Sequence, residues 1–250
     1  MIKKNEFFFI TITLVLSMMI MNDREAYPGN ISINVQDGNT EITAMGGKSN
    51  VHVVSGCKEG SGIRKSERRN VSSFNAVSFD GAFDVTIELQ QKRGLEVAGD
   101  DNIIPHIITE VKGDTLHVTS DKSICSKIGL HVNITNDDIQ KITADGSSDI
   151  SISDVKNRSL TVSINGAGDL TASGKTGTFA ANISGSGNVS ARDLHADEVD
   201  ISIDGTGDAV VYSSKKLRAS IDGAGDISYY GNPGEVKKHI SGAGDIEKGD

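Results

Sequence analysis

The chain has 250 residues and a formal net charge of −9 at pH 7, with 28 glycines, no tryptophan and only 36% hydrophobic residues. It is long enough for one large domain or two small ones, each with its own core. Because an acidic chain without a basic stripe repels phosphate backbones, the composition argues against nucleic acid as a partner. The many small residues suit a narrow core of stacked side chains.

Residues 1–26 have the pattern of a secretory signal peptide. Lys3 and Lys4 precede an apolar run from Phe7 to Met21, and the small residue Ala26 stands near the expected cut. At about 15 residues, the run is shorter than the ~20 that a membrane-spanning helix needs. We therefore predict an exported protein, in the periplasm, at the cell surface or outside the cell, with no membrane span after signal cleavage. An uncleaved N-terminal anchor is the alternative.

Residues 27–56 are expected to form N-terminal strands and a lead-in to the rest of the chain. Three short runs alternate apolar and polar residues, and glycine-containing turns separate them. The predicted strands are Ile31–Val35, Glu41–Met45 and Val51–Val53.

Residues 57–140 are predicted to form an N-terminal β lobe. Residues 56–70 lack apolar periodicity and are expected to be a surface loop or a lead-in strand. Alternation resumes at Phe74, and the segment Asp80–Val85 resembles the turn repeat described below, with Phe83 in place of the second glycine. An acidic start and mixed spacing at residues 100–111 allow one short helix there.

The two cysteines, Cys57 and Cys125, are candidates for a disulfide. After export they would meet an oxidising compartment, in which a single bridge persists. Two unpaired buried thiols are the alternative, because the sequence does not show whether the two Cα atoms lie within bonding range.

Residues 141–250 contain one turn repeated at a nearly constant interval, which predicts a repeat-rich β-solenoid lobe. The residue before the first glycine of each turn stands at positions 165, 184, 204, 222 and 241, so the steps are 19, 20, 18 and 19 residues. The copies are I-N-G-A-G-D-L at 164–170, I-S-G-S-G-N-V at 183–189, I-D-G-T-G-D-A at 203–209, I-D-G-A-G-D-I at 221–227 and I-S-G-A-G-D-I at 240–246. A weaker copy at 145–150 has Ser148 in place of the second glycine.

Apolar residues alternate with polar ones on both sides of each turn, which indicates strands with one buried face. Parallel stacking of coils of about 19–20 residues would place equivalent residues above one another, about 4.8 Å apart. One internal ladder would consist of Ile164, Ile183, Ile203, Ile221 and Ile240. The predicted fold class is therefore all-β, a parallel β-helix-like solenoid.

The Gly-x-Gly-Asp turn has a structural explanation and a functional alternative. The glycines permit a sharp corner with positive φ and avoid crowding the next coil, and the aspartate accepts backbone hydrogen bonds. The alternative is a calcium ladder, because stacked carboxylates repel by about 1 kcal/mol per pair and a cation would relieve that strain. Its members would be Asp149, Asp169, Asp208, Asp226 and Asp245. The spacing departs from the nine-residue calcium-binding repeat, so we predict no metal and no other cofactor.

No catalytic residues are predicted. The six histidines are scattered without metal-ligand spacing, and neither cysteine stands in a nucleophile motif. Aspartate pairs on adjacent coils keep a polysaccharide-cleaving β-helix enzyme open as an alternative. Repetition favours architecture, since a catalytic pair is needed only once. Tyr229 is expected to complete the apolar ladder, and Tyr230 to pack at the end of the solenoid.

Several segments together resemble the bacterial GIN-domain family, described as auto-transporter adhesin head domains. They are R-N-V-S-S-F-N-A-V at 69–77, D-G-A-F-D-V at 80–85, N-I-I-P at 102–105 and the repeated turns, so the resemblance covers about residues 50–246. It implies a right-handed parallel β-helix-like fold, often with two β lobes, in exported proteins common among Bacteroidetes. The family has no established catalytic or binding residues to carry over.

We therefore expect an exported, non-catalytic binding or adhesin-like module at the bacterial cell envelope. Exposed rows of Thr, Ser, Asn and Asp on rigid strands would present a repetitive polar surface to a glycan or an envelope protein, although the sequence does not identify the ligand. A structural spacer or scaffold is the alternative from another class.

Overall fold

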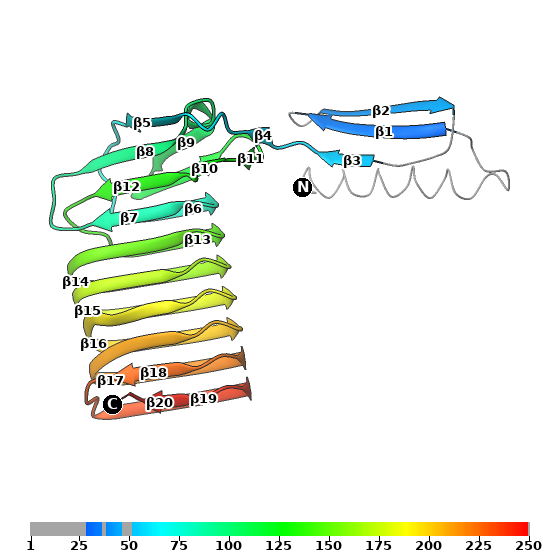
Figure 1. Cartoon of the computed structure of the whole chain (residues 1–250). Coiled ribbons are helices and arrows are strands. Elements are labelled where there is room, and N and C mark those ends of the chain that lie inside the picture. Colours follow the sequence, from blue (N-terminus) through cyan, green and yellow to red (C-terminus); the bar gives the residue numbers. More distant parts are fainter. Residues whose placement is uncertain (1–28, 37–38, 47–51, 250) are drawn as a thin grey trace. The chain divides into compact units, whose positions relative to one another are not determined.

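The computed structural model describes residues 29–36, 39–46 and 52–249, and the chain divides into two compact units, residues 1–56 and 57–250 (Figure 1). The predicted signal peptide, residues 1–26, lies outside the described residues. Within the described ranges, no helix is both long and apolar enough to cross a membrane.

The first unit contains a three-stranded sheet in the order β2-β1-β3. Strand β1 (Gly29–Gln36) pairs antiparallel with β2 (Asn39–Gly46) and parallel with β3 (His52–Ser55). These three strands confirm the ones predicted in this region. Each coincides with a run of alternating apolar and polar residues.

The first part of the second unit consists of short strands and one turn of 3₁₀-helix, Ile104–His106. The strands are β4 (Lys58–Glu59), β5 (Arg64–Arg68), β6 (Ala76–Gly81), β7 (Asp84–Glu88), β8 (Gly94–Asp100), β9 (Ile107–Lys112), β10 (Thr115–Ser120), β11 (Ile124–Cys125) and β12 (His131–Thr135). The helix allowed at residues 100–111 is thus reduced to that single turn. Residues from Ile107 onward form β9, which pairs antiparallel with β10. A helix of a few turns is marginally stable by itself, whereas the pairing with β10 gives the backbone of these residues hydrogen-bond partners.

The rest of the second unit is a stack of parallel coils, which confirms the all-β solenoid (Figure 1). Its strands are β13 (Lys141–Gly146), β14 (Asp149–Gly166), β15 (Leu170–Gly185), β16 (Val189–Gly205), β17 (Ala209–Ala224), β18 (Ile227–Tyr230), β19 (Glu235–Ala243) and β20 (Ile246–Lys248). Strands β6 and β7 pair in register with β13 and β14, so the segment with Phe83 forms the corner that precedes the first repeat.

The core is a set of apolar ladders along the stacking direction, as the period-two pattern predicts. Ile164, Ile183, Ile203 and Ile221 are each at most 1% exposed and lie in direct register. Ile240 continues the register on β19 but is 41% exposed, because no further coil covers it among the described residues. Tyr229 is 8% exposed and completes another ladder, as predicted.

Lysine covers part of this exposed end of the core. Lys238 stands on β19 in register with the buried Ala219, at a position that faces the core in the coils before it. Its ammonium group donates to the carbonyl of Ile246 and lies 5.3 Å from the centre of the Tyr229 ring. An inward-facing charge on an edge strand discourages edge-to-edge association of sheets.

The two glycines of each turn serve different physical needs. Gly205 has φ +142°, and a Cβ there would overlap the carbonyl oxygen of Gly185 on the preceding coil. Gly207 has no positive φ, but its Cβ would overlap the carbonyl oxygen of Gly187. The expectation of positive φ therefore holds for the first glycine only, and the second glycine is required by close coil-to-coil approach.

We expect Gly205→Ala to lower the free energy of unfolding by about 2 kcal/mol or more, because the residue combines a backbone conformation reserved for glycine with a steric overlap. Chemical denaturation measures the change. Gly234→Ala is the matched control, since Gly234 lacks a positive φ and the nearest atom to its added Cβ is 3.9 Å away. Equal effects of the two substitutions would contradict the explanation.

Candidate binding groove

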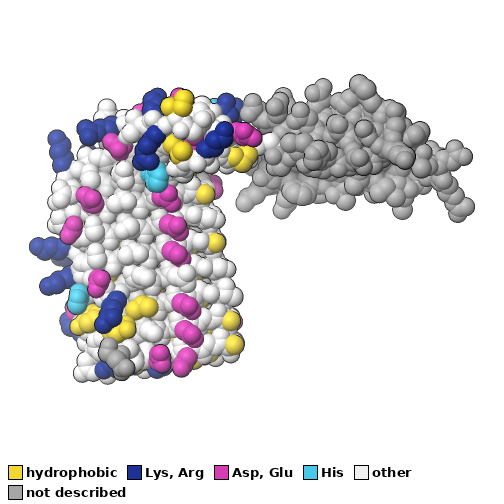
Figure 2. All heavy atoms as spheres, viewed as in Figure 1, with side chains coloured by type: hydrophobic (Ala, Val, Ile, Leu, Met, Phe, Trp, Pro, Cys, Tyr) yellow, Lys and Arg dark blue, Asp and Glu magenta, His cyan; other side chains and the backbone are white. Residues whose placement is uncertain are grey.

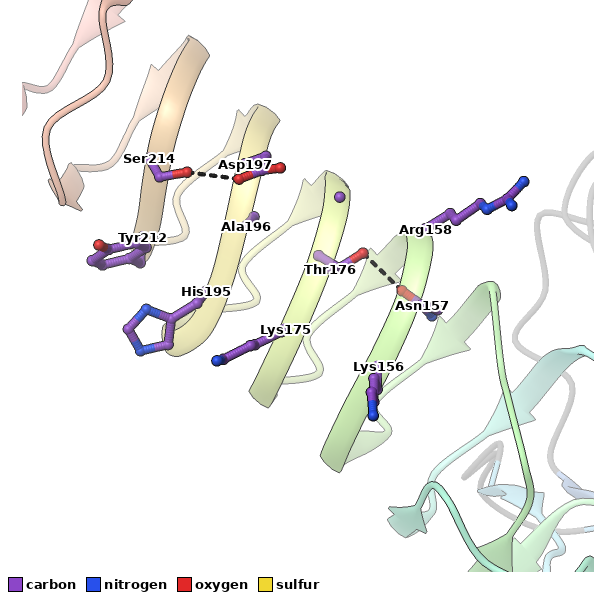
Figure 3. Close-up of a pocket in the computed structure, with 11 residues that line it drawn as sticks. Lys156, Asn157, Arg158, Lys175, Thr176, His195, Ala196, Asp197, Tyr212 and Ser214 are labelled. Carbon is purple, nitrogen blue, oxygen red and sulfur yellow. Dashed lines mark hydrogen bonds between the residues drawn. The ribbon is translucent and has the colours of Figure 1, made fainter.

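A hollow of about 640 Å³ crosses four consecutive coils of the solenoid, β14 to β17. It lies where each long strand bends between its two halves, away from the Gly-x-Gly-Asp corner. Four side chains in register form a column along it, one from each coil: Lys156, Lys175, His195 and Tyr212. In Figure 3 these four side chains leave the same side of the stacked ribbons. We call the hollow the groove and these four residues the groove column.

Two buried side chains, Thr176 and Ser213, and the half-buried Asn157 fix the floor of the groove. The Thr176 hydroxyl donates to the side-chain carbonyl of Asn157 at 2.7 Å, and the Asn157 amide donates to the backbone carbonyl of Ile139 at 2.9 Å. The Ser213 hydroxyl donates to the backbone carbonyl of Lys216 at 2.7 Å. Because these groups are paired within the protein, the backbone beneath the groove column is held in one arrangement.

The basic residues of the groove have no acidic partners within the described part of the chain. Lys156, Lys175 and Arg158 line the hollow and form no ion pair there. Lys156 and Lys175 are exposed and lie directly opposite each other on neighbouring coils, whose backbones are about 4.8 Å apart. Like charges directly opposite are destabilising in a sheet, so this pair opposes stability.

The single carboxylate in the lining of the groove, that of Asp197, is bound by neighbouring side chains of the protein. Asp197 accepts hydrogen bonds from Lys215 at 3.0 Å and from Ser214 at 2.9 Å. These bonds, the one from Lys215 foremost, hold the pKa of the Asp197 carboxyl below its usual range, so it is ionised at neutral pH. The charge of Asp197 is offset by Lys215, and the charges of Lys156 and Lys175 remain unopposed.

Aromatic rings occupy the other end of the groove column. The rings of His195 and Tyr212 are 4.3 Å apart between centroids and tilted by 53°. Tyr230 of β18 is the next residue in register after Tyr212, and the Arg192 guanidinium lies 3.9 Å from the centre of its ring. Tyr230 is half-buried rather than sealed in the core. Tyr230 thus extends the line of the groove column to a fifth coil, and along this line two lysines are followed by three aromatic side chains.

A second hollow, of about 590 Å³, lies in the first part of the second unit. Its lining includes Arg68, Arg69 and Arg93. Arg69 is largely used inside the protein, since its guanidinium donates to the carbonyls of Ile104 and Ile107. We therefore treat the groove on β14 to β17 as the candidate site.

The structure places the five aspartates of the proposed calcium ladder in one column, and this column has a structural use. Each of these carboxylates that is followed by a further coil accepts the backbone N–H of the equivalent residue on that coil. Asp149 accepts from Asp169 at 3.1 Å, Asp208 from Asp226 at 2.9 Å and Asp226 from Asp245 at 2.8 Å. Asp245, the last in the column, accepts the backbone N–H of Ile246 instead. Asn188 replaces aspartate once and accepts the N–H of Asp208 in the same way. Figure 2 shows a column of acidic side chains along the visible face of the coils.

The carboxylates of this column do not converge on a common point. Within the described residues, no group of three or more His, Cys, Asp or Glu side chains is arranged to hold a metal ion. The amide at Asn188 shows that the position needs an acceptor oxygen and not a charge. The calcium ladder therefore gains no support from the geometry.

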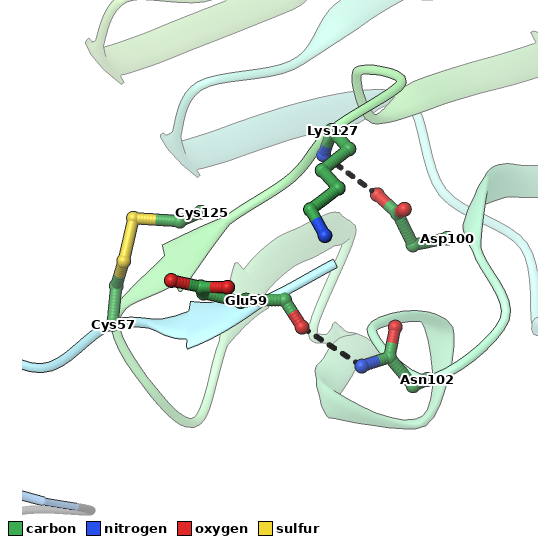
Figure 4. Close-up of a disulfide and its surroundings, with 6 residues drawn as sticks. All are labelled: Cys57, Glu59, Asp100, Asn102, Cys125 and Lys127. Carbon is green, nitrogen blue, oxygen red and sulfur yellow. Dashed lines mark hydrogen bonds between the residues drawn. A yellow bond between two sulfur atoms is a disulfide. The ribbon is translucent and has the colours of Figure 1, made fainter. Parts of the chain in front are cut away.

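The two cysteines, Cys57 and Cys125, form a disulfide with a Cα–Cα distance of 5.5 Å (Figure 4). It joins β11 to the residue just before β4, and these two strands pair only with each other. A bridge that closes a loop of 68 residues is worth about 4 kcal/mol in the chain-entropy model.

Beside the disulfide, Asp100 is a fully buried carboxylate. It accepts hydrogen bonds from the Ser126 hydroxyl at 2.6 Å and from the backbone N–H groups of Gly62 and Lys127. These bonds, that of Ser126 foremost, lower the pKa of Asp100. A Cβ at Gly60 would overlap the carboxylate, so the glycine leaves room for it. The pattern is that of a structural anchor for two loops.

Sequence reasoning missed the groove column. The histidines are scattered along the sequence, but the fold places His195 in register with a lysine on one side and a tyrosine on the other. The sequence signal for such a column would be exposed residues that recur at the same distance from each turn, but this distance differs from coil to coil. His195 follows Asn188 of its turn by seven residues, whereas Tyr212 follows Asp208 by only four.

We expect Asp208→Ala to lower the free energy of unfolding by about 1 kcal/mol, because the backbone N–H of Asp226 loses its acceptor. Asp208→Asn is the control and is expected to be nearly neutral, since Asn188 fills the equivalent position. Chemical denaturation with calcium and with chelator extends the test. A calcium-dependent rise in stability that Asp208→Asn removes would restore the metal-binding alternative.

The lowered pKa of Asp100 predicts an acid-sensitive anchor. A carboxyl whose pKa is depressed on folding stabilises the protein above its unfolded pKa, near 3.8, and loses that contribution as pH falls through the folded value. Asp100→Asn should be less stable than the wild type at pH 7, and the difference should shrink below about pH 4. Denaturation at both pH values measures it, with the exposed Asp114→Asn as control. A difference independent of pH would refute the anchor.

The chain matches the family model described as "Putative auto-transporter adhesin, head GIN domain" over residues 73–233. This match covers the corner with Phe83, the groove column and all but the last Gly-x-Gly-Asp turn. No curated protein sequence is similar enough to count as a relative.

Solved structures of similar fold come from Bacteroides and Parabacteroides and carry adhesin or binding-protein names. A putative adhesin from Bacteroides fragilis has a TM-score of 0.62 at 24% identity, covering 76% of this chain and 99% of its own. A putative lipid binding protein from Parabacteroides distasonis has a TM-score of 0.52 at 21% identity, covering 77% and 99%. A putative adhesin from Parabacteroides merdae has a TM-score of 0.50 at 21% identity, with the same coverage.

At these identities the solved structures support the fold alone, whereas the family match spans well over half of the chain. The matched residues include four of the five complete Gly-x-Gly turns. The chain belongs to the GIN-domain family.

Proposed function

We propose that this chain is an exported, non-catalytic, adhesin-like binding module of the bacterial cell envelope. The family to which it belongs is named for adhesin heads, and the solved structures of like fold include adhesins by name. The predicted signal peptide and the Bacteroides and Parabacteroides sources of those structures fit an envelope protein of Bacteroidetes.

The observation that carries the proposal is the groove. A passive spacer needs only a smooth, well-paired surface. This solenoid instead keeps two lysines opposite each other above a rigid polar floor, and neither forms an ion pair with any residue that the structure describes. Unopposed charges beside exposed rings in a concave surface are the features of a ligand site, with affinity supplied by charge and by ring contact. The groove therefore favours a binder over a scaffold.

Glycan cleavage is the less suitable activity for this groove. Hydrolysis of a glycosidic bond uses two carboxyl groups on opposite sides of the bond. Asp197 is the single carboxylate in the lining of the groove, and Lys215 and Ser214 occupy its oxygens. The aspartates of the repeated turns are hydrogen-bonded to the next coil, which again leaves no acid and base pair at the groove.

The test is retention of the purified full chain on bacterial envelope fractions and on a panel of immobilised glycans. We expect retention at micromolar protein, with no release of reducing ends from any glycan that is bound. Heat-unfolded protein serves as the control for unspecific adsorption. If neither envelopes nor glycans retain the folded chain, the scaffold alternative replaces the adhesin-like role. Release of reducing ends would instead favour the enzyme.

A further inference from the structure

The groove is locally basic, whereas the protein as a whole is acidic. The chain has a formal net charge of −9, and its Gly-x-Gly-Asp corners add a column of carboxylates on another part of the coils. Lys156, Lys175 and Arg158 line one hollow without an acidic partner in the described part of the chain. In Figure 2 basic side chains project from the left edge of the solenoid, apart from the acidic column. A local basic site on an acidic protein selects for an anionic ligand.

The charges and rings also lie along a line. Successive members of the groove column are one coil apart, so they recur about every 4.8 Å along the solenoid axis. A small anion would touch one or two coils, whereas a chain lying along the axis would meet the lysines first and the rings of His195, Tyr212 and Tyr230 next. The geometry thus suits a linear polymer with anionic groups and flat apolar faces.

We propose that the groove binds an acidic polysaccharide, with carboxylate or sulfate groups on Lys156 and Lys175 and sugar rings against His195 and Tyr212. Lysine ammonium groups form charge-assisted hydrogen bonds with such anions. The aromatic faces cover the apolar C–H faces of sugars, and the tyrosine hydroxyl remains available to their hydroxyl groups. This inference rests on the proposed binding function and names the ligand class of the same site.

Two other polyanions have the same charge, and the structure ranks them lower. A nucleic acid also combines phosphates with flat rings, but proteins that bind it present a basic stripe along its backbone, whereas the lysines and arginines of this groove are limited to Lys156, Arg158 and Lys175. The acidic column of a second copy is the other candidate. It lacks rings or apolar faces to meet His195 and Tyr212, because its side chains are carboxylates bound to their own backbone.

The experiment titrates the full chain with four probes at low and high salt: heparin for sulfate groups, polygalacturonate for carboxylates, dextran as a neutral polysaccharide, and a single-stranded oligodeoxynucleotide. We expect one or both acidic polysaccharides to bind, more weakly at high salt, and dextran not to bind. The double variant Lys156→Gln/Lys175→Gln should lose about tenfold or more in affinity. Lys127→Gln/Lys141→Gln removes the same charge from exposed positions outside the groove and should bind as the wild type does.

The aromatic half of the site has its own test. Tyr212→Ala should weaken polysaccharide binding several-fold, and Tyr212→Phe, which keeps the ring, should retain most of it. Inorganic polyphosphate, which has charge but no sugar ring, should bind Tyr212→Ala as well as it binds the wild type. Melting temperatures establish that each variant is folded before affinities are compared.

Four results would overturn the inference: dextran binding as tightly as the acidic polymers, the oligonucleotide binding as tightly with the same dependence on the lysines, salt-sensitive self-association that the lysine variant abolishes, or unchanged affinity in that variant. The proposed function fails separately. Envelope retention that persists in the lysine variant leaves an adhesin-like module with a different site. Polysaccharide binding without any envelope retention leaves the groove but removes the adhesin-like role.

Discussion

The structure depends on the close approach of parallel backbones at the Gly-x-Gly-Asp corner. Each coil must come within sheet hydrogen-bonding distance of the next while the chain turns sharply, and a Cβ at Gly205 or Gly207 would occupy the place of a carbonyl oxygen below it. Once the corners stack, the strands on both sides are held in register. The isoleucine ladder and the aspartate column follow from this register, whereas the groove column depends in addition on the bulges in the long strands.

Register has opposite consequences at two places on the surface. At the corners it aligns carboxylates, and each one that is followed by a further coil accepts a backbone N–H from that coil, so the column supports the fold. At the bend of the long strands it aligns two lysines that have no acidic partner in the described chain. In the aspartate column, hydrogen bonds from the backbone offset the repulsion between stacked carboxylates. The groove column leaves an unrelieved repulsion that an anionic ligand would remove.

The predictability of each column depended on its distance from the corner. The isoleucine ladder stands two residues before the first glycine and the aspartate column immediately after the second, so a constant period of about 19 residues was enough to align both. The groove column lies beyond irregularities in the strand pairing, at Ile152/Val155, Thr171/Gly174 and Ala191/His195. Each bulge changes the number of residues between corner and bend, so simple counting from one turn to the next does not bring His195 beside Tyr212.

The sequence by itself determined the all-β solenoid, its coil length and its inward-facing residues, because those features repeat at short range and need only period and side-chain size. The family was indicated by the resemblance of several segments to GIN domains. Tertiary structure decided what meets across the repeats. It brought Cys57 and Cys125 together, buried Asp100 between two loops, reduced an expected helix to one turn of 3₁₀-helix, and placed lysines and aromatic rings in one groove. These depend on bulges and on contacts between residues distant in the chain, which local sequence patterns do not encode.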